Sequence, residues 1–119
     1  MRGKYNKQDC MKVTFREEAL SELYETGSTK DRKYRSICRN KKLVAGYIKA
    51  VGYMLDVKSV DRLKMISSLH YEKLKYQHDE PRSSVRIANG YIERLIFTET
   101  DDGIEVELIE IDSTHYGNK

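Results

Sequence analysis

The chain has 119 residues, of which 34% are charged and 39% are hydrophobic, and its formal net charge is +3 at pH 7. This length predicts one domain, large enough to bury a core without disulfides. No apolar run approaches the roughly 18 residues of a membrane span, and residues 1–10 lack the apolar centre of a signal peptide. We therefore expect a cytoplasmic chain without a membrane partner.

Cysteine content and charge distribution indicate which kinds of site and partner to expect. Cys10 and Cys38 belong to no Cys-x-x-Cys pattern and to no Cys/His cluster, so we expect no disulfide framework, no metal and no other cofactor. Residues 1–76 hold 18 Lys and Arg against 9 Asp and Glu, whereas residues 77–119 hold 4 against 10. This asymmetry indicates one surface for a polyanion and another for a different partner, unless the charges only solvate the surface.

The N-terminal segment predicts an arm, a short strand and a helix. Residues 1–12 are polar and basic without periodicity, which predicts a flexible N-terminal arm before a single domain at 13–119. Val13–Phe15 is a β-prone run typical of a short edge strand. An amphipathic helix should begin near Glu17, where acidic residues suit the helix dipole, and end at Gly27.

Residues 33–56 predict one long helix, because apolar residues recur there at intervals of three, four and seven. The expected core-facing positions are Ile37, Val44, Ile48, Val51 and Leu55, with Tyr47 and Met54 beside them. The opposite face is basic, with Arg32, Lys33, Arg35, Arg39, Lys41, Lys42 and Lys49. Such a face is more often solvated than bound to nucleic acid phosphates, and both readings stay open.

The second half of the chain predicts short elements followed by a sheet. A short helix or turn is expected at Val60–Ser67, an irregular strand at Leu69–Tyr76, and a loop with the only proline at Gln77–Arg82. Three antiparallel strands should follow at Ser83–Ala88, Tyr91–Phe97 and Ile104–Ile111. The Asn-Gly and Asp-Gly pairs between these strands tolerate the positive φ of tight hairpin turns. The last strand has apolar residues at both parities, which predicts either a β-bulge or a strand covered on both faces.

The order of these elements predicts the fold class. A strand, then helices, then a run of strands is typical of an α+β domain, here with the N-terminal helices packed on one face of an antiparallel sheet. Side chains alternate across a strand, so the apolar neighbours of Arg86 and Arg94 point toward the helices while both arginines point to the uncovered face. His115 should emerge near the same face, which predicts an anion site.

The residues that could carry chemistry are cations. They are Lys73, Lys75, Arg82, Arg86, Arg94 and His115, with Tyr116 adjacent. RNA cleavage through the ribose 2′-hydroxyl needs a base, an acid and cations that stabilise the phosphoryl oxygens, and it needs no metal. The usual pKa of histidine is close to neutral pH, as the base and the acid require, whereas the pKa of a lysine must be lowered to reach that range. Arginine stays protonated and can only stabilise charge.

Each of these residues also has a plainer interpretation. Arg86 and Arg94 could pair across strands with Glu93, Glu105 or Glu107. A histidine so near the end of the chain is more often an exposed bystander. Lysines on an edge strand often do no more than discourage association between sheets.

Several segments together resemble the RelE/HigB superfamily of toxins from bacterial type II toxin-antitoxin systems, and the HigB branch in particular. The segments are Leu23–Lys30, Lys73–Lys75, Ser84–Gly90 and Arg94–Phe97, with His115 after the last strand. The resemblance spans roughly residues 13–116. It differs from the usual pattern at Tyr76, where many relatives have glycine, and in a longer segment between Asn89 and Arg94.

The resemblance implies a RelE-like α+β toxin that cuts messenger RNA on the ribosome without a metal. It also implies a cognate helix-turn-helix antitoxin, and it says nothing of the oligomeric state. By position, the implied catalytic residues are Lys75, Arg86, Arg94 and His115, with Lys73, Arg82 and Tyr116 in RNA binding. The choice between Lys73 and Lys75 stays open. The alternative is a non-catalytic RNA- or protein-binding module that retains the toxin fold.

Overall fold

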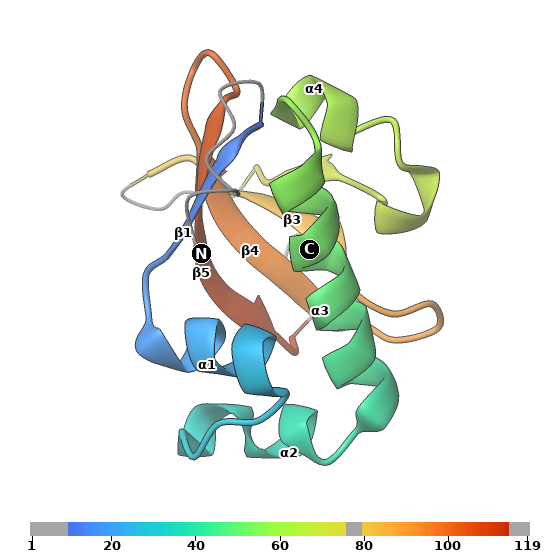
Figure 1. Ribbon diagram of the computed structural model, residues 1–119. Helices are drawn as coiled ribbons and strands as arrows, with labels where there is room; N and C mark the ends of the chain where they lie inside the picture. The colour runs from blue at the N-terminus through green and yellow to red at the C-terminus, as the bar shows by residue number, and fades with distance from the viewer. Residues whose placement is uncertain (1–9, 76–79, 115–119) are drawn as a thin grey trace.

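The protein folds into helices on one side of a β-sheet (Figure 1). The structure is a computed structural model that describes residues 10–75 and 80–114. Its helical elements are α1 (Glu18–Thr26), the 3-10 turn η2 (Arg32–Tyr34), α2 (Arg35–Cys38), α3 (Lys41–Asp56), α4 (Val60–Leu63) and the 3-10 turn η3 (Ser67–Leu69). Its strands are β1 (Lys12–Phe15), β2 (Glu72–Lys73), β3 (Ser83–Arg86), β4 (Arg94–Glu99) and β5 (Glu105–Asp112). Across the described ranges, none of the helices could cross a membrane.

The sheet is mixed. Its order over the described residues is β1-β5-β4-β3-β2, and β1 runs parallel to β5 while the other neighbours are antiparallel. The predicted α+β class and the edge position of the first strand are confirmed, but the prediction of an antiparallel sheet is wrong. Local patterns identify a strand without giving its direction, and β1 joins β5 only after the helices and three other strands have intervened.

The start of the domain lies slightly earlier than expected. Met11 is buried, and its N–H donates to the Val57 carbonyl at 2.9 Å. Strand β1 begins at Lys12, which pairs with Glu105. Residues 11 and 12 thus belong to the folded domain, and residues 1–9 of the expected arm lie outside the described part of the chain.

The long helix expected at 33–56 is interrupted at Asn40. The side-chain oxygen of Asn40 accepts hydrogen bonds from the backbone N–H groups of Lys42 and Leu43, which is the geometry of an N-cap. The chain therefore forms η2, α2 and then α3 as separate elements. The predicted core-facing stripe is also displaced, because the buried positions of α3 are Leu43, Tyr47, Ala50, Val51 and Met54.

Tyr47 explains how this stripe is buried. Its side chain has no exposed surface, and its hydroxyl donates to the Leu20 carbonyl at 2.6 Å. A buried tyrosine needs such a partner, and this bond ties α3 to α1. Of the stripe that we predicted, Ile37 and Val51 are buried, whereas Val44, Ile48 and Leu55 are only half-buried.

The two hairpins differ from the expected strand lengths. Strand β3 ends at Arg86 and β4 begins at Arg94, so the loop is longer than the two-residue turn that Asn89-Gly90 predicts. That pair still makes a turn, because the Tyr91 N–H donates to the Ala88 carbonyl and Gly90 has φ of +86°. The Asp-Gly turn before β5 is confirmed, with Gly103 at φ of +72°.

A β-bulge explains why the last strand has apolar residues at both odd and even positions. Ile96 pairs with Glu110, but the next residue, Phe97, pairs with Leu108. Ile109 is therefore the extra residue on β5. It lies with Ile96 and Leu74 in a small cluster on the face away from the helices, while Leu108 belongs to the main core. Of the two alternatives for this strand, the bulge is confirmed.

Candidate functional site

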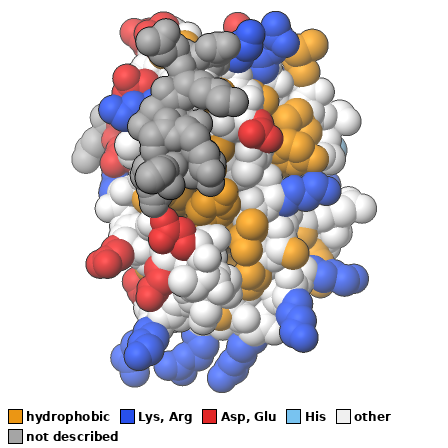
Figure 2. All heavy atoms as spheres, viewed as in Figure 1, with side chains coloured by type: hydrophobic (Ala, Val, Ile, Leu, Met, Phe, Trp, Pro, Cys, Tyr) orange, Lys and Arg blue, Asp and Glu red, His pale blue; other side chains and the backbone are white. Residues whose placement is uncertain are grey.

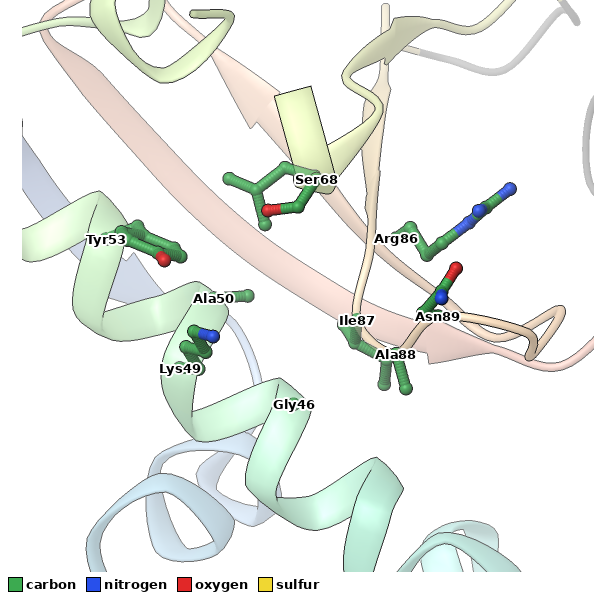
Figure 3. A pocket seen from close by; sticks show the side chains of 10 residues that line it. Gly46, Lys49, Ala50, Tyr53, Ser68, Arg86, Ile87, Ala88 and Asn89 are labelled. Carbon is green, nitrogen blue, oxygen red and sulfur yellow. The ribbon is translucent and has the colours of Figure 1, made fainter. Parts of the chain in front are cut away.

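Arg86 and Arg94 lie directly opposite each other on neighbouring antiparallel strands. Side chains of directly opposed residues share a face, with Cβ atoms about 4.5–5.5 Å apart. Their apolar chain neighbours, Val85 and Leu95, form the next strand pair and are buried in the core beneath the helices. Figure 3 shows Arg86 pointing away from α3. The two cations therefore meet on the sheet face opposite the helices, as strand alternation predicts.

Arg94 is held by three neighbouring elements. Its Nε–H donates to the Ser84 hydroxyl at 2.7 Å, and its Nη2 donates to the His70 carbonyl at 2.6 Å. The same Nη2 lies 3.8 Å from a carboxylate oxygen of Glu72, and 14% of the arginine side chain is exposed. Burial lowers the pKa of Arg94, Glu72 opposes that shift, and the charge of Arg86 adds to it.

Arg86 is the less constrained of the two cations. It is half-buried, and it makes no hydrogen bond or ion pair to any residue in the ranges 10–75 and 80–114. The cross-strand carboxylates that we considered as partners behave differently. Glu107 binds Arg16 at 2.8 Å, and the carboxylate near Arg94 is Glu72, which the sequence patterns did not single out.

The predicted lysines and Arg82 do not gather with the arginine pair. Lys73 is the strand partner of Ser83, which places it on the helix side of the sheet, where its ammonium lies 3.4 Å from Glu99. Lys75 is exposed beyond the end of β2. Arg82 precedes β3 and pairs with Glu80 at 3.2 Å. His115 and Tyr116 lie outside the described residues.

Two residues near the arginine pair, His70 and Asp112, are not among the site residues that the sequence predicts. His70 is exposed, follows η3 in a left-handed backbone conformation with φ of 48°, and binds Arg94 through its carbonyl. Asp112 is the strand partner of Arg94 on β5, and its carboxylate accepts a hydrogen bond from Thr114 at 2.9 Å. His70 lies within the irregular strand expected at Leu69–Tyr76, but nothing in the sequence indicates that its carbonyl reaches a residue 24 positions away on another strand.

A hollow of about 170 Å³ lies between α3 and the end of β3, and Arg86 but not Arg94 is among its lining residues. Lys49 and Tyr53 of α3 form one wall, Ser68 of η3 another, and the end of β3 with Arg86 and Asn89 the third (Figure 3). Lysine, hydroxyl and amide groups beside an aromatic ring can bind a planar polar group. The hollow is open to solvent at the edge of the sheet that β2 leaves uncovered, since β2 pairs only with Ser83 and Ser84.

Positive charge is concentrated at a second place on the surface. Figure 2 shows Lys and Arg side chains at the end of the molecule where α2 and the start of α3 lie. The exposed cations of this basic end are Arg32, Arg35, Arg39, Lys41 and Lys42. A cluster of this kind suits the phosphates of a nucleic acid.

The described residues contain no group of three or more His, Cys, Asp or Glu side chains that could hold a metal ion. No protein-family model matches the chain, and a search of curated proteins found no match.

Proposed function

We propose that this chain is a metal-independent endoribonuclease that cuts messenger RNA on the ribosome, a toxin of the RelE/HigB type with a RelE-like fold. The observation that carries the proposal is the pair Arg86 and Arg94, opposed on the sheet face away from the helices. Like charges placed directly opposite each other destabilise a sheet. Two guanidinium groups kept in this position are better explained by an anion that both of them bind.

The reaction assigned to this site is attack by a ribose 2′-oxygen on the neighbouring phosphorus. The bond between the 2′-oxygen and phosphorus forms, the bond to the 5′-oxygen breaks, and a 2′,3′-cyclic phosphate remains. Negative charge grows on the phosphoryl oxygens, and Arg86 and Arg94 stabilise it as permanently protonated groups. A base takes the 2′-proton and an acid returns one to the 5′-oxygen.

Two side chains are proposed for the proton transfers. His115 follows from the family resemblance, and His70 is added because its backbone binds Arg94. Lys75, which the resemblance also implies, lies away from the arginine pair beyond the end of β2 and is assigned to RNA binding instead. Histidine is suited to both roles near neutral pH. The hollow beside Arg86 would receive part of the nucleotide next to the cut, and the basic end of the molecule, with Arg82, would bind more distant RNA.

The proposed partners follow from the same resemblance. The substrate is messenger RNA on the ribosome, the location is the cytoplasm, and a helix-turn-helix antitoxin holds the toxin inactive. A short neighbouring reading frame that encodes such a protein would support this part of the proposal.

The decisive experiment maps RNA ends after induced expression of the chain. The wild type should produce new ends within translated codons, and Arg86→Ala should not. Arg62→Ala is a matched control, because Arg62 is an exposed arginine on α4 that neither lines the hollow nor bonds to Arg94. Absence of new ends in the wild type, or equal cutting by Arg86→Ala, would remove the proposed nuclease activity.

The second candidate is a non-catalytic RNA- or protein-binding module. The observation in its favour is that protein groups already occupy much of the Arg94 guanidinium. Under this reading, the protein binds an oligoribonucleotide in an Arg86-dependent manner and leaves it uncut.

A further inference from the structure

Described residues of the chain occupy one edge of the Arg94 guanidinium. A guanidinium group has five N–H donors in a fixed plane. The Nε–H and an Nη2–H of Arg94, which lie along the same edge, donate to the Ser84 hydroxyl and to the His70 carbonyl. None of the hydrogen bonds and ion pairs within residues 10–75 and 80–114 uses Nη1. The edge that carries Nη1 is thus left for a ligand.

Ser84 is the side-chain anchor of this arrangement. It has no exposed surface, and its hydroxyl is 2.7 Å from Nε. The second anchor is a backbone carbonyl, which no side-chain substitution removes. Loss of the Ser84 hydroxyl would leave a half-buried charged donor without its acceptor, and such a donor reorients to find water or another oxygen.

We propose that Ser84 is a positioning residue, which orients Arg94 so that only the Nη1 edge meets the scissile phosphate beside Arg86. This inference rests on the proposed function for its substrate. It assigns a role to a buried serine that touches no substrate and acts through Arg94. A phosphate bound in this way meets Arg94 end-on, while Arg86, which no described residue holds, adapts to the remaining oxygens.

Ser83 provides a matched control on the same strand. It is also a serine without exposed surface, but its hydroxyl faces the helix side and bonds to Glu99 at 3.0 Å and to Tyr71 at 3.1 Å. Ser83→Ala and Ser84→Ala therefore delete the same atom at the same depth. Only the second deletion touches Arg94.

The first readout is the Arg94 Nε–H signal in a nitrogen-15 NMR spectrum, together with its rate of exchange with water. Ser84→Ala should accelerate this exchange about tenfold or more, because one hydrogen bond to a charged group is lost. Ser83→Ala should leave it unchanged. An unchanged rate in Ser84→Ala would overturn the inference whatever the enzyme does.

The second readout separates positioning from stability. In ribosome-dependent cleavage, normalised to the folded fraction from circular dichroism, Ser84→Ala should lower kcat about tenfold while KM changes less than about twofold. Ser83→Ala should keep the wild-type kcat, and equal losses in both variants would overturn the positioning role.

A wild type that cuts no RNA removes the proposed function, and the role of Ser84 is then decided by binding. The probe is a short oligoribonucleotide with 2′-O-methyl groups, which cannot be cut. Ser84→Ala should weaken its affinity about tenfold relative to Ser83→Ala, and equal affinities would overturn the inference.

Discussion

Gly46 of α3 lies directly against the backbone carbonyl of Ile87, so close that a Cβ atom on Gly46 would overlap the carbonyl oxygen and stand 2.8 Å from the carbonyl carbon. Helix α3 therefore packs on the backbone at the exit of β3. Ile87 follows Arg86, so this contact also holds the end of the strand that presents this arginine.

Gly46→Ala should destabilise the protein by about 1–3 kcal/mol or more, because the methyl group meets backbone that cannot move aside cheaply. Gly52→Ala is the control on the same helix, since a Cβ atom there has no neighbour within 4 Å. It should stabilise the protein by about 1 kcal/mol through helix propensity. Urea denaturation measures both. A neutral Gly46→Ala would show that α3 does not pack on Ile87 as described.

Arg86→Ala and Arg94→Ala should separate activity from stability. Arg86 is half-buried and makes no hydrogen bond or ion pair to a described residue, so its loss should abolish cleavage while changing the free energy of unfolding by less than about 0.5 kcal/mol. Arg94 bonds to Ser84 and to His70, so its loss should abolish cleavage and cost about 1.5–3 kcal/mol. Thermal or urea denaturation beside RNA-end mapping tests both, and equal stability of the two variants would contradict the assignment.

Asn40→Ala should cost about 1 kcal/mol of stability, because it removes the acceptor for two N–H groups at the start of α3. Asn40→Ser should recover most of the loss, since serine caps helices about as well. Urea denaturation compares the three proteins. If Asn40→Ala is as stable as the wild type, α2 and α3 are not separated by this cap.

Stability should fall in alkaline solution. Burial, together with a hydrogen bond to Glu99, raises the pKa of Tyr71 to about 12 from its ordinary value of 10.0, although the bond to Ser83 opposes the shift. A raised pKa means that the folded state favours the neutral phenol. The contribution of Tyr71 to the free energy of unfolding is therefore complete below pH 10 and disappears as the pH approaches 12. Burial also raises the pKa of Tyr34 and Tyr47.

The measurement is urea denaturation between pH 8 and about 11.5, for the wild type and Tyr71→Phe. Tyr71→Phe should be less stable at pH 8, because Glu99 and Ser83 lose a partner, and its stability should decline less steeply above pH 10. Parallel declines in the two proteins would show that Tyr71 titrates as in the unfolded chain.

Much of the architecture is determined locally by the sequence. Strand alternation places Arg86 and Arg94 on one face because a period of two is a property of the extended backbone itself. Gly27 ends α1 in the left-handed conformation at φ of 81°, and Gly103 turns the chain before β5, because glycine alone adopts such angles without strain. These features need no knowledge of distant residues.

Only the tertiary structure decides where elements meet and which partners they find. Three such contacts join residues far apart in the chain. Strand β1 runs parallel to β5, the pairing of Lys73 with Ser83 places Lys73 on the helix side, and the His70 carbonyl accepts a hydrogen bond from Arg94. Hydrophobic periodicity also predicts a buried face of α3 that is displaced by about one residue, because two neighbouring faces of this helix are similarly apolar. Packing against the sheet and the hydrogen bond from Tyr47 to the Leu20 carbonyl determine which face is buried.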